Sequence, residues 1–314
     1  MSAEAARPQT QARPRRRTSS LARRRAIDGY LMIAPWLLGF LIFTAGPMIG
    51  SIYLSLSRYE VLTPPVFIGT QNYQEILVDS LFLTSLYNTV YYVALYVPLH
   101  LILALIAALA LNAKIRGLGI YRTVYYLPAI VPSVASVLLW MWIFNPDFGL
   151  LNAFLGIFGI PPRAWLFDSE MAKPALIIMA LWALGSHMII FIAGLQGVPE
   201  ALYEAASIDG CNWWGRFRFV TLPMITPVIF FNLVVSIIGS FQVFNAAFIA
   251  TDGGPANATL FYVLYLYRNG FQFFKMGYAA TLAWVLFIII VIFTVIQFRL
   301  SSHWVFYEAD ARKG

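Results

Sequence analysis

Few residues in this chain could do chemistry, and their spacing argues against catalysis. Only four of the 314 residues are lysines, and none follows a glycine, so the Gly-Lys pair of a phosphate-binding loop is absent. The three histidines, His100, His187 and His303, have no neighbours at metal-ligand spacing. The single cysteine, Cys211, cannot form an internal disulfide. We therefore expect a non-catalytic chain with no metal site and no bound cofactor.

The richest polar segment lies between two apolar stretches and runs from Pro199 to Gly210. Proline suits the start of a helix, acidic residues near that start complement the helix dipole, and glycine suits a left-handed stop. The pattern predicts a short, well-delimited helix. Small residues in its middle, Ala205 and Ala206, would let another surface approach closely. The following piece, 211–219, mixes aromatics with two arginines, so an ordinary interfacial loop is the alternative.

A second set of polar side chains could line a path for a polar solute. These residues lie in two apolar segments and, by type, offer hydroxyl, amide, imidazole and aromatic surfaces that suit a sugar. For Ser236 and Ser240, four residues apart on one helical face, the competing role is packing between helices. For His187 the competing role is a hydrogen bond to a neighbouring helix. The candidates are Trp182, Gly185, His187, Ser236, Ser240 and Asn245.

The elements that carry these residues must be membrane helices. The composition is 60% hydrophobic and 11% charged, too poor in charge for a water-facing domain. Six stretches reach the roughly 20 apolar residues that span a bilayer, and in lipid they must be helical. None of them contains Asp, Glu, Lys or Arg. They are Leu31–Ser57, Ser80–Ala113, Thr123–Pro146, Pro174–Pro199, Phe219–Thr251 and Met276–Phe298.

Two shorter uncharged runs, Phe148–Pro162 and Gly253–Tyr267, are left out of this count because they are too short to cross a bilayer. We expect the first to contain an interfacial helix at Gly149–Phe158. The predicted fold class is thus all-α integral membrane, with six transmembrane helices.

The basic residues orient these helices. With the N-terminus inside, 16 of the 21 Lys and Arg residues fall on the inner side, which is the positive-inside pattern. Both termini are then cytoplasmic. The net charge of +7 is explained by topology and lipid headgroups, and nucleic acid is not an expected partner.

The positions of the apolar stretches and of the basic residues divide the chain into four parts. We expect a disordered basic tail at 1–25, a first helix with an outer segment at 26–83, a five-helix core at 84–300 containing the loop 197–222, and a cytoplasmic tail at 301–314.

The loop resembles the EAA loop of binding-protein-dependent ABC importer permeases. The resemblance rests on Glu204-Ala205-Ala206, Asp209-Gly210 and Leu222-Pro223 at fixed spacing. The rest of the chain is similar to the MalF/UgpA branch of carbohydrate importers. The further matching pieces include Asn88-Thr89, Asn145-Pro146, Thr251-Asp252-Gly253-Gly254-Pro255 and Gly277-Tyr278-Ala279-Ala280.

The resemblance implies a type I importer transmembrane domain in a bacterial or archaeal inner membrane. It implies that Glu204, Ala205, Ala206, Asp209 and Gly210 dock on a separate ATPase, which would use ATP and Mg²⁺. The implied partners are a second homologous permease, an ATPase dimer, an extracytoplasmic solute-binding protein and a sugar.

Two questions stay open at this point. The resemblance does not name the sugar, and glycerol 3-phosphate remains a candidate because relatives of this branch carry it. A self-sufficient secondary transporter is the alternative class, although ion-coupled pumps usually carry buried ionisable residues that these spans lack.

Overall fold

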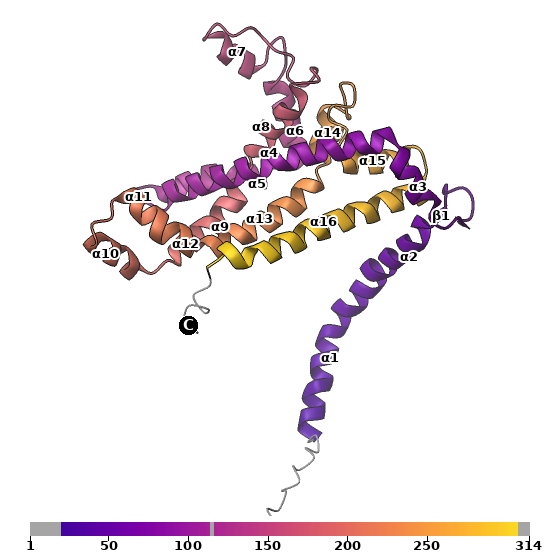
Figure 1. The fold of residues 1–314 in the computed structure, drawn as a ribbon, viewed down its shortest axis with the longest axis horizontal. Coiled ribbons are helices and arrows are strands. Elements are labelled where there is room, and N and C mark those ends of the chain that lie inside the picture. Colours follow the sequence, from indigo (N-terminus) through magenta and orange to yellow (C-terminus); the bar gives the residue numbers. More distant parts are fainter. Residues whose placement is uncertain (1–19, 114–115, 307–314) are drawn as a thin grey trace, which may run out of the picture. The chain divides into compact units, whose positions relative to one another are not determined.

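The computed structural model describes residues 20–113 and 116–306, and its helices carry almost all of the regular structure (Figure 1). The chain forms two compact units, Met1–Tyr53 and Leu54–Gly314. The predicted tail residues 1–19, the basic residue Lys114 and residues 307–314 lie outside the described residues.

The described part of the first unit, residues 20–53, is one long apolar helix. It comprises α1 (Ser20–Phe40), a π-helical turn (Leu41–Ala45) and α2 (Gly46–Ser55), which continues across the boundary between the units. Since α1 begins at Ser20, the last residues of the expected disordered tail are helical. In this π-helical turn the backbone amide of Gly46 bonds to the carbonyl of Leu41. Pro47 follows directly, and because proline has no N–H it disturbs the regular pattern of helical hydrogen bonds.

In the second unit, a small segment of two strands and a short helix comes first. Strands β1 (Ser57–Arg58) and β2 (Val66–Phe67) pair antiparallel, and α3 (Gln71–Val78) follows. The amide of Asn72 donates to the carbonyl oxygens of Ser55 and Ser57 at 2.9 and 3.0 Å. A Cβ on Gly277 would lie 2.1 Å from the carbonyl of Ser57, so only glycine lets the start of the last helix pack here.

Helix α4 (Ser80–Leu111) is the centre of this unit. It packs against α8 (Ala172–Leu181), α9 (Gly185–Gln196), α13 (Thr226–Phe241) and α15 (Tyr262–Tyr267). Asp79 caps its start by accepting hydrogen bonds from the amides of Leu81 and Phe82. The last helix, α16 (Met276–Trp304), lies along α13 and α15.

Four helices of the described chain are long and apolar enough to cross a membrane. They cover Arg23–Ser55, Ser80–Leu111, Thr226–Ala250 and Met276–Trp304. Two further bent pairs, α5 (Leu118–Ile130) with α6 (Ser133–Ile143) and α8 with α9, raise the number to six if each pair is one crossing. The fold class predicted from the sequence is confirmed.

The predicted continuous span Thr123–Pro146 differs from the structure. It is bent by 98° between α5 and α6, where Val131 is extended just before Pro132. A residue before proline is driven out of the helical region, which explains the break. The predicted span Pro174–Pro199 is bent by 47° between α8 and α9.

The remaining elements are short. The two runs left out of the span count contain only α7 (Leu150–Gly156) and α15, so neither is long enough to cross a bilayer. The loop after α9 contains α10 (Glu200–Ile208), α11 (Trp213–Arg216), a π-turn (Phe217–Thr221) and α12 (Leu222–Met224). Helix α14 (Asn245–Ala250) continues α13, and a π-turn at Arg268–Gln272 follows α15.

Candidate functional site

Helix α10 is the predicted loop helix, and both of its ends are well defined. Pro199 is the extended residue before the first turn, and Glu200 lies in that turn. At the other end Gly210 has φ +78°, a left-handed conformation that favours glycine. The amide of Cys211 bonds to the carbonyl of Ala206 at 2.9 Å, and that of Gly210 to Ser207 at 3.1 Å. This paired arrangement is a Schellman motif, which ends the helix sharply.

The two faces of α10 differ. Ala206 is buried, with 8% of its surface exposed, and the hydroxyl of Tyr203 lies 3.0 Å from that of Thr221. The burial of Ala206 and the Tyr203–Thr221 contact show that this face of α10, its inner face, packs against the residues just before α12 and α13. On the outer face Glu204, Ala205, Asp209 and Gly210 are exposed. Of the five predicted docking residues, four therefore form an accessible surface, while Ala206 packs inside the chain.

The second piece of the loop is also helical. Asn212 caps α11, its side-chain oxygen accepting from the amide of Gly215 at 2.8 Å. Trp213 stacks on Phe217, with ring centroids 5.9 Å apart. In Figure 1, α10 and α11 lie at one end of the second unit, and β1 and α3 lie at the other.

Two of the predicted pathway residues contact each other directly. The Nε2 atom of His187, on α9, lies 2.9 Å from the hydroxyl of Ser236 on α13. Its Nδ1 atom lies 3.1 Å from Nε2 of His100 on α4. The chain of contacts therefore joins three core helices. His100 was not predicted as a site residue, because nothing in a single sequence indicates which histidines from different helices will meet.

The other predicted pathway residues do not join this chain of contacts. The hydroxyl of Ser240 donates to the carbonyl of Ile237 on its own helix at 3.0 Å. Asn245, which is exposed, donates to the hydroxyl of Ser133 at 2.9 Å and thereby links α14 to α6.

The last two predicted pathway residues contact neighbouring helices. Trp182 meets Trp140 edge to face, with ring centroids 6.0 Å apart. Gly185 is buried, and a Cβ there would lie 2.7 Å from the carbonyl of Tyr125. That position allows α5 and α9 to pack closely.

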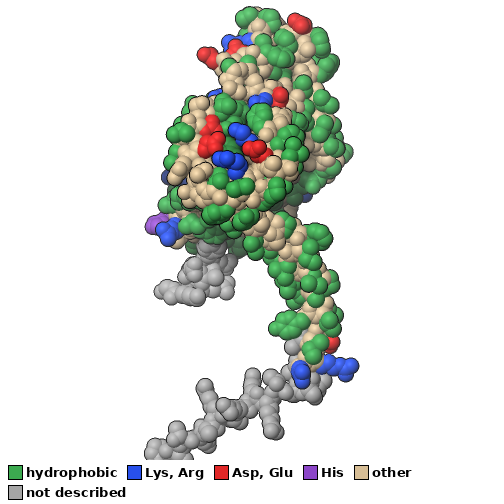
Figure 2. Space-filling model, turned by 90° about the vertical axis from the view of Figure 1, so that its right-hand side faces the viewer, with side chains coloured by type: hydrophobic (Ala, Val, Ile, Leu, Met, Phe, Trp, Pro, Cys, Tyr) green, Lys and Arg blue, Asp and Glu red, His purple; other side chains and the backbone are tan. Residues whose placement is uncertain are grey.

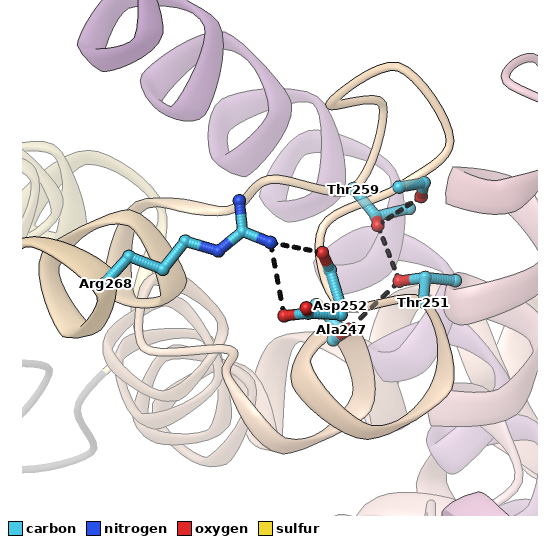
Figure 3. A network of polar contacts seen from close by, with 6 residues as sticks. Ala247, Thr251, Asp252, Thr259 and Arg268 are labelled. Carbon is cyan, nitrogen blue, oxygen red and sulfur yellow. Dashed lines mark hydrogen bonds and ion pairs between the residues drawn. The ribbon is translucent and has the colours of Figure 1, made fainter. Parts of the chain in front are cut away.

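The opposite end of the unit contains polar clusters whose residues were not predicted as site residues. Arg268 contacts both the carboxylate of Asp252, at 3.2 Å, and its carbonyl oxygen (Figure 3). The hydroxyls of Thr251 and Thr259 lie 2.6 Å apart in the same loop. The amide of Asn88 on α4 donates to the carbonyls of Asn257 and Leu260, so the loop is fastened to the start of α4.

Asp79 joins three helices at this end. Besides capping α4, its carboxylate accepts hydrogen bonds from the phenols of Tyr265 and Tyr278. Partial burial acts to raise the pKa of Asp79, but these phenols and the α4 amides outweigh it and hold the pKa below its usual value. Burial and the neighbouring carboxylate raise the pKa of Tyr265 to about 12, so it remains a donor.

Charged side chains gather on the face where β1 and α3 lie (Figure 2). A pocket of about 170 Å³ there is lined by Arg58, Tyr59, Glu60, Asn72, Glu75, Lys275 and Tyr278. Its charges are mixed, in contrast to the apolar helices around it. Among the described residues no three His, Cys, Asp or Glu side chains are grouped so that they could hold a metal ion.

Long apolar helices, bent helix pairs and an exposed, capped loop helix together define a multi-pass membrane protein. The model of the family of binding-protein-dependent transport system inner membrane components matches residues 80–305. The chain belongs to this family.

Individual relatives cover almost the whole chain. The probable ABC transporter permease protein YesP of Bacillus subtilis is 43% identical over 288 residues, covering 90% of this chain and 93% of that protein. The lactose transport system permease protein LacF of Rhizobium radiobacter is 38% identical, covering 89% and 96%.

A solved structure shares the fold. A chain of a bacterial alginate ABC transporter, crystallised with an alginate pentasaccharide-bound periplasmic protein, superposes with a TM-score of 0.77 at 23% identity, covering 90% of this chain and 97% of that one.

Proposed function

We propose that this chain is one permease subunit of an ATP-driven carbohydrate importer and forms half of the translocation pathway. The observation that carries the proposal is α10, a rigid helix closed by a Schellman motif and exposed on one face. A short helix of this kind can transmit the closing motion of a partner as a rigid body. The sequence contains no Gly-Lys pair of a phosphate-binding loop, so in this proposal ATP is hydrolysed by a separate ATPase.

The exposed face of α10 is the proposed contact with the ATPase. Glu204, Ala205, Asp209 and Gly210 would touch the partner, while Ala206 and Tyr203 fasten the helix to its own subunit. A coupling element needs both kinds of residue, because motion received on one face must be passed to the spans through the other. ATP and Mg²⁺ would be bound by the ATPase.

A carbohydrate is the proposed substrate class. A relative that covers nearly all of this chain is named for lactose, and a chain with the same fold belongs to an alginate transporter. Glycerol 3-phosphate is the second candidate. The six predicted spans contain no Lys or Arg that would compensate a phosphate, and this favours a sugar without a phosphate group.

The proposed assembly contains a second homologous permease, two ATPase subunits and an extracytoplasmic solute-binding protein, in a bacterial or archaeal inner membrane. Both termini of this chain would be cytoplasmic, as the distribution of basic residues predicts. The end with α10 then faces the cytoplasm, and the charged face with β1 and α3 faces outward, where a binding protein would arrive.

Uptake of a labelled sugar by cells carrying loop variants tests the coupling proposal. We expect Gly210→Pro and Glu204→Arg to abolish uptake without reducing the amount of protein in the membrane. Proline cannot adopt the φ of +78° found at Gly210, and arginine reverses a charge on the exposed face. Glu170→Arg, at an exposed position remote from α10 in the sequence, is the control and should transport normally. Undiminished uptake by both loop variants would exclude this role for α10.

The alternative is a secondary transporter that works alone. It predicts uptake by this chain without any ATPase, driven by an ion gradient. Backbone carbonyls at a helix break such as that between α5 and α6 could bind an ion, which is the feature that keeps this alternative open.

A further inference from the structure

A pocket lies between the end of α4 and the second half of the loop. Its volume is about 240 Å³, and it is lined by Leu109, Tyr203, Trp213, Arg216, Phe217 and Thr221. Most of this wall is apolar or aromatic. The polar groups are the Tyr203–Thr221 hydroxyl pair and the guanidinium of Arg216.

The charge of Arg216 is not compensated within the part of the chain that the structure describes. Its guanidinium has no ion pair or hydrogen bond there, although the side chain is partly buried. Arg218, two residues further along the chain, is exposed, lies 6.0 Å from the ring of Phe219 and is not part of the pocket wall. A cation in the wall of a mainly apolar pocket forms a complementary surface for a molecule with an anionic head and an apolar body.

The acidic and the basic residues of the loop lie on different helical segments. Helix α10 and its C-cap residue contain Glu200, Glu204 and Asp209 and no basic residue, whereas α11 and the π-turn contain Arg216 and Arg218 and no acidic one. The two halves therefore attract partners of different charge. An anionic surface would be repelled by α10 and attracted by α11.

Three aromatic side chains in this half of the loop are exposed, and one of them, Trp213, lines the pocket. Trp213 is 65% exposed, Trp214 57% and Phe219 69%. Tryptophans with arginines next to the start of a span are typical of the membrane interface, where the ring contacts lipid and the charge contacts headgroups. These residues directly precede α12 and α13, the beginning of a span.

We propose that this pocket binds an anionic phospholipid of the inner leaflet. Arg216 would hold the phosphate, and Leu109, Trp213 and Phe217 would cover the upper part of an acyl chain. Basic pockets between helices on the cytoplasmic side are a recurring form of lipid recognition. Because Tyr203 of α10 lines the same pocket, the bound lipid would brace the coupling helix from its inner face.

Brominated lipids test the proposal directly, since bromine on an acyl chain quenches tryptophan only at close range. The full-length chain is reconstituted in phosphatidylcholine vesicles, and brominated phosphatidylglycerol or brominated phosphatidylcholine is added in small mole fractions. The chain has 9 tryptophans, so the signal of Trp213 is taken as the difference between wild type and Trp213→Phe. We expect the phosphatidylglycerol to quench this signal at a mole fraction about fivefold lower, the effect of one cation at an anionic surface.

Arg216→Gln should remove this preference while quenching by brominated phosphatidylcholine remains, and Arg216→Lys should retain most of it. Arg299→Gln, at an exposed arginine near the end of α16, is the matched control and should keep the full preference. Equal quenching by the two lipids, or an unchanged preference in Arg216→Gln, would overturn the proposal. So would quenching by neither lipid, which would mean that Trp213 faces water or a protein partner. The assay measures lipid contact and not transport, so its failure would leave the importer proposal untouched.

Discussion

The imidazole of His187 lies 2.9 Å from the hydroxyl of Ser236, and this contact joins α9 to α13 in the middle of the second unit. Both residues had been considered for the sugar pathway, with helix packing as the competing role. Because His187 also lies 3.1 Å from His100, removing any one member leaves a polar atom without its partner.

We expect Ser236→Ala to lower the stability of the protein in detergent by about 1–2 kcal/mol, the cost of an unpaired buried group. Ser240→Ala is the control and should have little effect, because Ser240 bonds only to its own helix. The measurement is the apparent melting temperature. The KM for sugar separates the two roles: an unchanged KM in Ser236→Ala assigns the pair to packing, and a raised KM assigns it to the pathway.

Gly185 supports a close approach between helices. Gly185→Ala should destabilise the protein by about 1–3 kcal/mol, because the added Cβ would lie 2.7 Å from the carbonyl of Tyr125. Gly239→Ala on α13 is the matched control. No atom lies within 4 Å of a Cβ there, so helix propensity predicts no loss or a small gain. Equal melting temperatures for the two variants would contradict the packing of α5 on α9.

Asp79 should stabilise the end of the unit opposite α10. Asp79→Ala removes the cap of α4 and the acceptor of two phenols, and we expect a loss of about 1–3 kcal/mol. Asp147→Ala, at an exposed carboxylate, is the control and should melt like wild type. If both variants lost the same amount of stability, the result would contradict a specific stabilising role for Asp79.

The pH dependence of this effect follows from the lowered pKa of Asp79. A depressed carboxyl pKa contributes stability that is complete above the ordinary value of 3.8 and is lost as the pH falls through the lower folded value. The difference in melting temperature between wild type and Asp79→Ala should therefore be constant from pH 5 to pH 8. A difference that shrank as the pH fell from 8 to 6 would show that the carboxyl titrates in that range.

The two alanines of the loop helix should behave differently. Ala205 is exposed, so Ala205→Arg should abolish sugar uptake while the melting temperature stays within about 1 °C of wild type, as is usual for surface substitutions. Ala206 is 8% exposed, so Ala206→Arg should lower the melting temperature as well as uptake. Equal stability of the two variants would show that the inner face of α10 is not packed as described.

The sequence predicted the type of the membrane helices, and their number if each bent pair is one crossing, because length and lack of charge are local properties. It also predicted the left-handed end of α10 at Gly210, which the structure confirms with φ +78°. The 98° bend at Pro132 was missed, although two prolines, Pro128 and Pro132, were visible. Length and lack of charge identify a long apolar run as a span, but they do not indicate a bend inside it.

The contacts between helices could not be predicted from one sequence. The two phenols that donate to Asp79 lie 186 and 199 residues away, and the two carbonyls that accept from Asn88 lie 169 and 172 residues away. Which polar side chains meet depends on how the helices pack, and helix packing depends on shapes that periodicity does not encode. Ala206 illustrates the same limit: its residue type suited a docking surface, and only the packing of α10 placed it inside.

The central claim is that a separate ATPase drives transport through this chain by way of α10. It is tested most directly in vesicles that contain this chain, its second permease and the ATPase, with the binding protein and labelled sugar outside. We predict uptake that requires ATP on the loop side, and that ceases in Glu204→Arg although the subunits still assemble. Uptake that continued without the ATPase, driven by an ion gradient, would contradict the claim.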